Sequence, residues 1–141
     1  MTTFESSIKT INAAQEVVYQ KMADLSNLQQ YVSQIEQNEH LKGKVKNVRF
    51  DVDSCHASIE PLGELGIRII DREPYKTIKF EPENSPLQFN LWIQLVSKEP
   101  YVTKLKITLK ADIGFMMKGL VSKPLQKFVD GLADAIERFP F

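Results

Sequence analysis

Residues 112–141 read DIGFMMKGLVSKPLQKFVDGLADAIERFPF, and this stretch decides how the rest of the chain can fold. Its apolar residues recur at steps of three and four, which places them on one face of an α-helix. These positions are Ile113, Met116, Met117, Leu120, Val121, Leu125, Phe128, Val129, Leu132, Ala133 and Ile136. A helix over this stretch would be roughly 36 Å long at about 1.5 Å per residue. Such a helix needs a large apolar surface to pack against, so we expect a sheet with one apolar face.

Pro124 interrupts the helical pattern. Proline lacks the backbone N–H that would bond to Leu120, and its ring clashes with the preceding turn. Two interpretations stay open: a kinked helix, or a loop over residues 119–123 followed by a new helix that Pro124 opens. Under both, residues 115–123 form the looser half and residues 125–136 form the anchor.

Apolar and polar residues alternate in six short segments between Val45 and Lys110. A period of two is typical of strands that bury one face. The expected inner residues are Val48, Phe50, Val52, Cys55, Ala57, Ile59, Leu65, Ile67, Ile69, Ile78, Phe80, Leu87, Phe89, Leu91, Ile93, Leu95, Leu105, Ile107 and Leu109. Short turns between consecutive strands predict an antiparallel meander. Residues 3–11 alternate too, which adds a first strand and makes seven.

Two short helices are expected between the first and second strands. Asn12 with Gln15, and Ser26 with Gln29, have the spacing of capping boxes, in which side chains bind free backbone N–H groups. The apolar positions of these helices are Ala14, Val17, Val18, Met22, Leu25, Leu28, Tyr31, Val32 and Ile35. The fold class is therefore α+β: a seven-stranded, curved antiparallel sheet wraps around a long C-terminal helix. We expect a single domain over residues 1–141.

The composition excludes several functions. Eighteen Lys and Arg residues balance eighteen Asp and Glu residues, which argues against nucleic acid and against a general attraction to anionic lipid. No apolar run approaches the roughly 18 residues of a membrane-spanning helix, and the first residues lack the features of a signal peptide. Cys55 is the only cysteine, so no intrachain disulfide can form, and a cytoplasmic location is expected.

Residues 11–19, INAAQEVVY, and 25–28, LSNL, resemble the opening of the START-like superfamily, also called SRPBCC. Members include the birch-pollen allergen, START lipid-transfer domains and polyketide cyclase-like proteins. The order of elements resembles the helix-grip fold of this superfamily over nearly the whole chain. Members usually carry an aromatic residue, often Trp, shortly after the second motif, and Tyr31 is the nearest candidate here. The resemblance implies a deep cavity between the sheet and the long helix.

The alternation indicates independently that an apolar sheet face meets an apolar helix. Apolar lining with few polar groups is the usual character of a ligand pocket. The predicted ligand-binding residues are Phe50, Ile59, Ile67, Phe80, Phe89, Leu91, Ile93, Ile107, Met116, Met117 and Leu120. Met116 and Met117 are expected at the cavity mouth, where flexible thioether side chains would suit varied apolar ligands; the alternative is that they only fill the core.

Few groups could perform chemistry in such a cavity. By strand parity the inner face carries Ser6, Thr10 and Cys55 but no ionisable residue apart from the thiol, so a proton-transfer site is not expected. Cys55 is expected to be a buried, inert thiol, because activation requires a cationic neighbour or a helix N-terminus. No cofactor is expected.

Two histidines allow a metal-site hypothesis. His56 and Glu60 share an outer strand face, and His40 lies in a polar loop beside Glu36 and Glu39. Two ligands do not make a zinc site, so solvated surface positions are the preferred interpretation for both, and no metal is predicted.

Trp92 is expected on the outer sheet face with Asn90 and Gln94, where it is either half covered by neighbours or part of a homodimer or partner surface. The function we expect is non-catalytic binding or transport of an apolar or amphipathic small molecule or lipid, with the looser half of the last helix as a gate. The alternatives are a protein-interaction module with a filled core and a polyketide cyclase-like enzyme.

Overall fold

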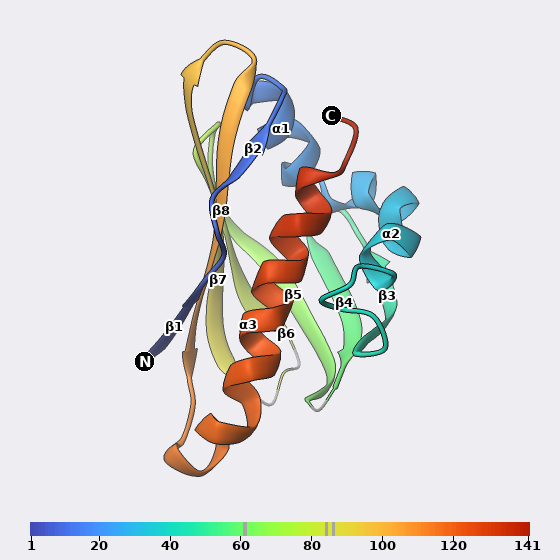
Figure 1. The fold of residues 1–141 in the computed structure, drawn as a ribbon, viewed down its shortest axis with the longest axis vertical. Helices are drawn as coiled ribbons and strands as arrows, with labels where there is room; N and C mark the ends of the chain where they lie inside the picture. The colour runs from blue at the N-terminus through green and yellow to red at the C-terminus, as the bar shows by residue number, and fades with distance from the viewer. Residues whose placement is uncertain (61, 84, 86) are drawn as a thin grey trace.

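An antiparallel sheet curves around one long helix in the computed structural model, which describes residues 1–60, 62–83, 85 and 87–141 (Figure 1). The described strands are β1 (Thr2–Glu5), β2 (Lys9–Ile11), β3 (Val45–Phe50), β4 (Ser54–Ile59), β5 (Gly63–Glu73), β6 (Thr77–Glu83), β7 (Gln88–Glu99) and β8 (Val102–Asp112). Their order in the sheet is β1-β8-β7-β6-β5-β4-β3, and β2 also pairs with β8. The six strands from β3 to β8 therefore form the predicted meander.

The inner face of the sheet carries the predicted apolar residues of β4 to β8. Ile78, Leu91, Leu105 and Ile107 are fully buried, and their outward neighbours are half-buried or exposed except for Thr108, which is buried. One-sided burial fixes the register, because a slip by one residue would move every apolar side chain into water. Val52 is the exception: it is 54% exposed, in the turn between β3 and β4.

The predicted first strand is in fact two strands, which makes eight in the described part of the chain. Glu5 pairs with Thr108 and Lys9 pairs with Leu105, so the N-terminal segment has one residue more than β8 between these pairs. An extra residue of this kind reverses the side-chain parity beyond it. The prediction that Thr10 points inward is therefore wrong: Thr10 is exposed and Ile11 is buried.

The helical corner after β2 is confirmed, but its predicted capping boxes are wrong. It contains α1 (Gln15–Ala23), the 3₁₀ helix η1 (Leu25–Tyr31) and α2 (Val32–Glu36). Gln15 donates instead to the backbone oxygens of Tyr75 and Leu95, and Asp24 caps η1 by accepting from the Ser26 N–H at 3.0 Å. Tertiary partners thus replace the first predicted capping box, and a different local carboxylate, that of Asp24, replaces the second.

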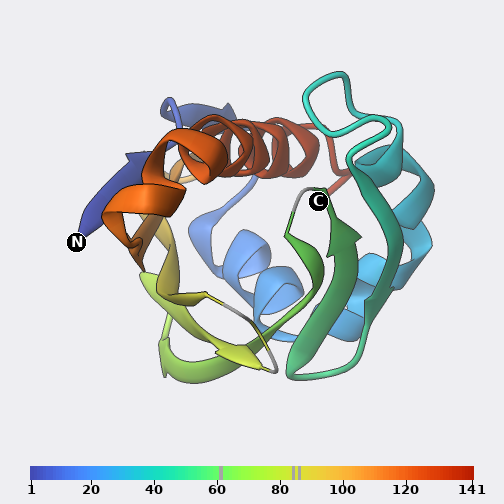
Figure 2. The same ribbon diagram turned by 90° about the horizontal axis from the view of Figure 1, so that it is seen from below.

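The long helix α3 (Phe115–Glu137) lies across the open side of the curved sheet (Figure 2). It runs through Pro124 without a loop, so the interpretation of a new helix opened by this proline is wrong. Its closest backbone contacts are with β8, β1, β2 and α2. Towards its C-terminus, Gly131 packs directly on the Leu41 side chain, and a Cβ at this glycine would lie 2.5 Å from Leu41 Cγ.

Candidate ligand cavity

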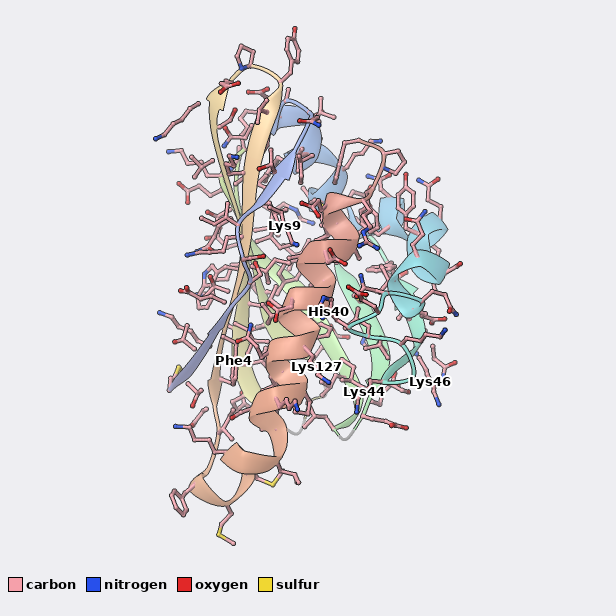
Figure 3. All side chains as sticks on the ribbon, viewed as in Figure 1. Phe4, Lys9, His40, Lys44, Lys46 and Lys127 are labelled. Carbon is pink, nitrogen blue, oxygen red and sulfur yellow. The ribbon has the colours of Figure 1, made fainter. Side chains whose placement is uncertain are left out.

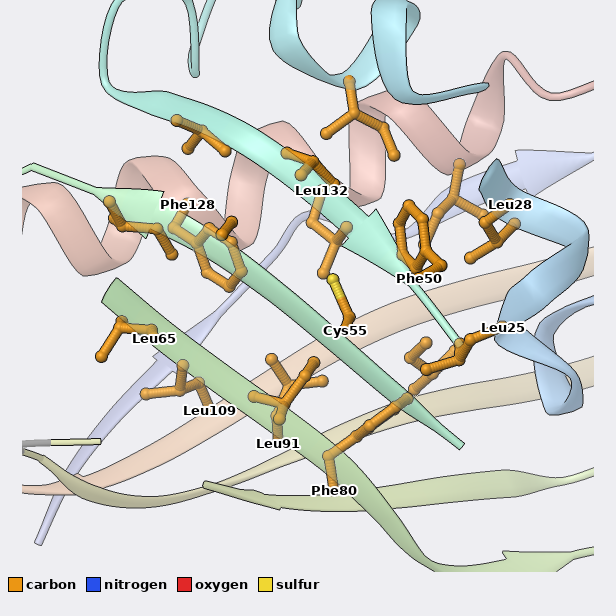
Figure 4. Close-up of a pocket in the computed structure, with 18 of the residues that line it drawn as sticks. Leu25, Leu28, Phe50, Cys55, Leu65, Phe80, Leu91, Leu109, Phe128 and Leu132 are labelled. Carbon is orange, nitrogen blue, oxygen red and sulfur yellow. The ribbon is translucent and has the colours of Figure 1, made fainter. Parts of the chain in front are cut away.

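A cavity of about 80 Å³ lies between the sheet, α3 and the helical corner (Figure 4). This volume is several times the 10–15 Å³ or so that one water molecule requires. Its lining comprises Met22, Leu25, Leu28, Ile35, Val45, Val48, Phe50, Cys55, Ala57, Ile59, Leu65, Ile67, Phe80, Phe89, Leu91, Ile93, Leu109, Leu125, Phe128, Leu132 and Ile136. The cavity is thus enclosed almost entirely by hydrocarbon.

The position of α3 explains why this space is not filled. The helix lies closest to the strands β8, β1 and β2 at one side of the sheet. Its side chains Phe128 and Leu132 face Phe50 of β3 and Cys55 of β4 across the cavity (Figure 4). Phe50, Cys55, Phe128 and Leu132 keep part of their surface accessible, unlike the fully buried residues around them.

Cys55 carries the only ionisable group among the described lining residues. Burial raises the pKa of its thiol to about 12, although the Arg49 cation acts in the opposite direction. The thiol therefore stays protonated at neutral pH, and a protonated thiol is a poor nucleophile and a poor metal ligand. The expectation of an inert cysteine agrees with this environment.

Seven of the predicted ligand-binding residues line the cavity: Phe50, Ile59, Ile67, Phe80, Phe89, Leu91 and Ile93. Ile107 does not, although Leu109 on the same strand does. Met116, Met117 and Leu120 are 89%, 42% and 60% exposed and lie outside the lining, at the free end of α3. The part of any of these residues in binding stays a prediction.

The sequence prediction placed the last helix beside the cavity but missed the helical residues that line it. Met22, Leu25, Leu28 and Ile35 come from the helical corner, and Leu125, Phe128, Leu132 and Ile136 come from α3. Their helical spacing was visible in the sequence and identified them as core residues. That spacing does not show which core residues leave a space in front of them, because this depends on where α3 crosses the sheet.

His56 and Glu60 do not form a pair. His56 Nε2 on β4 lies 3.3 Å from Glu83 Oε1 at the end of β6, and Glu60 is exposed. This contact explains why residue 66 is glycine: a Cβ there would overlap the His56 ring and lie 2.8 Å from the Glu83 carbonyl oxygen.

His40 lies close to Glu39 and Asp134, with one ligand atom of each residue within 4.8 Å of the others. Asp134 already accepts a hydrogen bond from Asn38 Nδ2 at 2.9 Å. Lys9 Nζ and Arg138 Nη2 lie 3.5 and 3.3 Å from its carboxylate oxygens. These cations repel a metal ion and satisfy the carboxylate, so the cluster is a structural ion network.

Trp92 lies on the outer sheet face, as predicted, and is half-buried. The Lys79 and Lys110 Nζ atoms lie 5.4 and 5.7 Å from the centre of its ring. Such cation–π contacts cover the indole with neighbouring side chains. The dimer hypothesis for this face stays a prediction.

No protein-family model matches the chain, and no curated protein sequence matches it. Solved structures do. Norcoclaurine synthase from Thalictrum flavum, in complex with dopamine and hydroxybenzaldehyde, has a TM-score of 0.67 at 12% identity. The alignment covers 97% of this chain and 84% of the synthase chain. A START superfamily protein from Mycobacterium smegmatis has a TM-score of 0.59 at 14% identity, over 96% and 97% of the two chains. A Deinococcus radiodurans protein has a TM-score of 0.55 at 16% identity, over 94% and 93%.

These likenesses establish that the chain has the START-like, or SRPBCC, fold in its helix-grip form. At 12–16% identity, these structures show the fold of the chain alone. No helix in the described part of the chain is long and apolar enough to cross a membrane.

Proposed function

We propose that this protein binds an apolar or amphipathic small molecule, such as a lipid, in the cavity beneath α3 and does so without catalysis. The observation that carries the proposal is the lining, where the Cys55 thiol is the only ionisable group among the described residues. Burial of each CH₂ group of a ligand in such a site contributes about 0.8 kcal/mol. A polar group would lose its hydrogen bonds to water and find no partner, so any headgroup should stay outside.

The lining argues against the alternative of a cyclase-like enzyme. Proton transfer requires a titratable group within hydrogen-bond reach of the substrate. Among the described lining residues only Cys55 titrates, and burial raises its pKa to about 12. Norcoclaurine synthase suggests that this fold can carry an enzyme active site. A shared fold does not by itself provide a titratable group in the lining of this cavity.

The proposal is tested by filling the cavity. Ala57 lies on its wall, so Ala57→Leu adds three carbon atoms to the space that a ligand would occupy. We expect the wild-type protein to bind the amphipathic dye anilinonaphthalene sulfonate and to retain lipid in native mass spectrometry. Ala57→Leu should weaken dye binding by about ten-fold, which corresponds to about 1.4 kcal/mol.

Ala23→Leu is the matched control, because Ala23 is a half-buried alanine at the end of α1 outside the lining. It should leave dye binding at the wild-type value. Equal binding by Ala57→Leu and wild type, with both proteins folded by circular dichroism, would show that the cavity is not the site.

A further inference from the structure

The first two turns of α3 expose apolar side chains to an unusual degree. Phe115 is 92%, Met116 89%, Leu120 60% and Met117 42% exposed. We call these four residues the apolar tip. The rest of the helix behaves differently, since Val121, Leu125 and Val129 are buried against the sheet. A run of exposed apolar residues in one place marks a surface that contacts something else.

The apolar tip lies at one end of the molecule, where α3 begins beyond the neighbouring strands (Figure 1). Figure 3 shows side chains at this end of the helix extending away from the rest of the chain. The tip is thus a small projection. A stable protein interface buries about 800 Å² on each partner, mostly between complementary surfaces, and four side chains on a projecting turn supply only part of that. A bilayer accepts a projection without a matching groove.

The charges around the tip specify the kind of bilayer. Residues 113–129 contain Lys118, Lys123 and Lys127 but no Asp or Glu, and the exposed Asp112 just before them is the nearest acidic residue on that side in the sequence. Lys118 and Lys123 are exposed. The first turn of α3 carries no acidic residue and begins at Gly114, so its backbone N–H groups add a partial positive charge. Apolar side chains flanked by lysines match the interface of a membrane that contains anionic lipid.

We propose that the apolar tip inserts into the interfacial layer of an anionic bilayer, with Lys118 and Lys123 at the lipid phosphates. Phe115 and Met116 enter deepest, because they are the most exposed of the four. The contact is reversible, since a single short turn contributes far less than a spanning helix. It does not require a ligand in the cavity, so it stands or falls separately from the proposed function.

Sedimentation of the full chain with vesicles tests this proposal. We expect binding to vesicles of phosphatidylcholine with phosphatidylglycerol, weaker binding to phosphatidylcholine alone, and loss of the difference at high salt, which screens the lysines. The double variant Phe115→Ser and Met116→Ser should lower the vesicle partition coefficient by about ten-fold or more. Lys118→Gln with Lys123→Gln should lower it several-fold on anionic vesicles only.

The control is the double variant Val96→Ser and Tyr101→Ser, which removes exposed apolar side chains near the β7–β8 hairpin at the opposite end of the molecule. It should bind vesicles like the wild type. All substituted residues are exposed, so the variants should fold, and thermal melts check this. Absence of vesicle binding, or equal binding by the tip variant and wild type, would overturn the proposal. So would a concentration-dependent dimer that the tip variant abolishes, because a second copy would then cover the tip.

Discussion

Asp134 shows how one buried carboxylate connects three parts of the chain. It lies on α3 and is reached by Asn38 from the loop after α2, by Lys9 from β2 and by Arg138 from the last turn. Burial acts to raise the pKa of this carboxyl group. The Asn38 hydrogen bond and the Arg138 and Lys9 cations outweigh it, because the group lies close to the surface, and the net pKa is lowered.

A carboxyl group whose pKa is lower in the folded state favours folding at pH values above its unfolded pKa, which is about 3.9. Its contribution is fully present above that value and is lost as the pH falls through the lower folded pKa. Asp134→Asn should therefore lower the free energy of unfolding by about 1–3 kcal/mol at pH 7 and flatten its decline below about pH 4. Urea unfolding at a series of pH values measures both effects.

Asp130→Asn serves as the control, because Asp130 is a half-buried carboxylate one turn earlier that accepts only from Gln126 among the described side chains. Its acid profile should follow the wild type. If Asp134→Asn kept the same acid dependence as the wild type, the network around Asp134 would not contribute to stability.

Gly66 occupies a place where no larger residue fits. A Cβ at this position would overlap the His56 ring and lie 2.8 Å from the backbone oxygen of Glu83, and this backbone atom cannot move without disturbing β6. Gly66→Ala should lower the free energy of unfolding by about 1–3 kcal/mol.

At Gly119 no described atom lies within 4 Å of an added Cβ, so Gly119→Ala in α3 should raise the free energy of unfolding by about 0.5–1 kcal/mol. Thermal or urea unfolding distinguishes the two, and equal effects would contradict this account.

At the level of the elements, α3 is continuous although Pro124 cannot donate to the Leu120 carbonyl oxygen. Phe115, Met116 and Leu120 before it are exposed and Val121 is buried, while most of the residues after it are buried or half-buried. Pro124 therefore weakens the helix where the exposed turns meet the packed ones.

Pro124→Ala should restore this hydrogen bond and raise the free energy of unfolding by about 1 kcal/mol or more. The larger effect should be local: the amide protons of residues 117–120 should exchange more slowly with solvent. Hydrogen exchange detected by mass spectrometry measures this, with Lys123→Ala as the control that leaves the proline in place. Unchanged exchange in Pro124→Ala would mean that the proline does not limit the stability of these turns.

The sequence predicted elements well where burial alone determines them. Leu91, Leu105 and Ile107 alternate with polar residues because one face of their strands is buried, and this pattern survives in any register that keeps the core dry. The split between β1 and β2 could not be predicted this way, because an extra residue opposite β8 leaves the composition unchanged. The capping boxes failed because Gln15 finds partners on Tyr75 and Leu95, which are distant in the sequence.

At the level of the whole molecule, the order of elements was enough to predict the fold, because a long apolar helix and a one-sided meander have few ways to bury each other. The cavity could be predicted only in part. Phe50 and Ile67 line it and Ile107 does not, although all three belong to the inner face. Membership of β8 does not explain the difference, because Leu109 of the same strand lines the cavity, and no local pattern in the sequence distinguishes the two.

The net charge of the chain also predicted only part of what the protein could bind. Equal numbers of acidic and basic residues exclude a strong overall field, but they do not describe where the charges lie. The three lysines of residues 113–129 become meaningful only when the structure shows that the first part of this segment leaves its apolar residues exposed.

Because Asp134 and Gly131 fix α3 at one end while the apolar tip is unsupported at the other, the helix is a cantilever. A force on the free end of the helix would bend it where its hydrogen bonding is weakest, and one backbone hydrogen bond is missing at Pro124. Leu125, the next residue, is the first residue of α3 on the cavity wall. A contact that displaced the tip would therefore act on α3 next to the residue where the cavity wall begins, while Asp134 and Gly131 hold the other end.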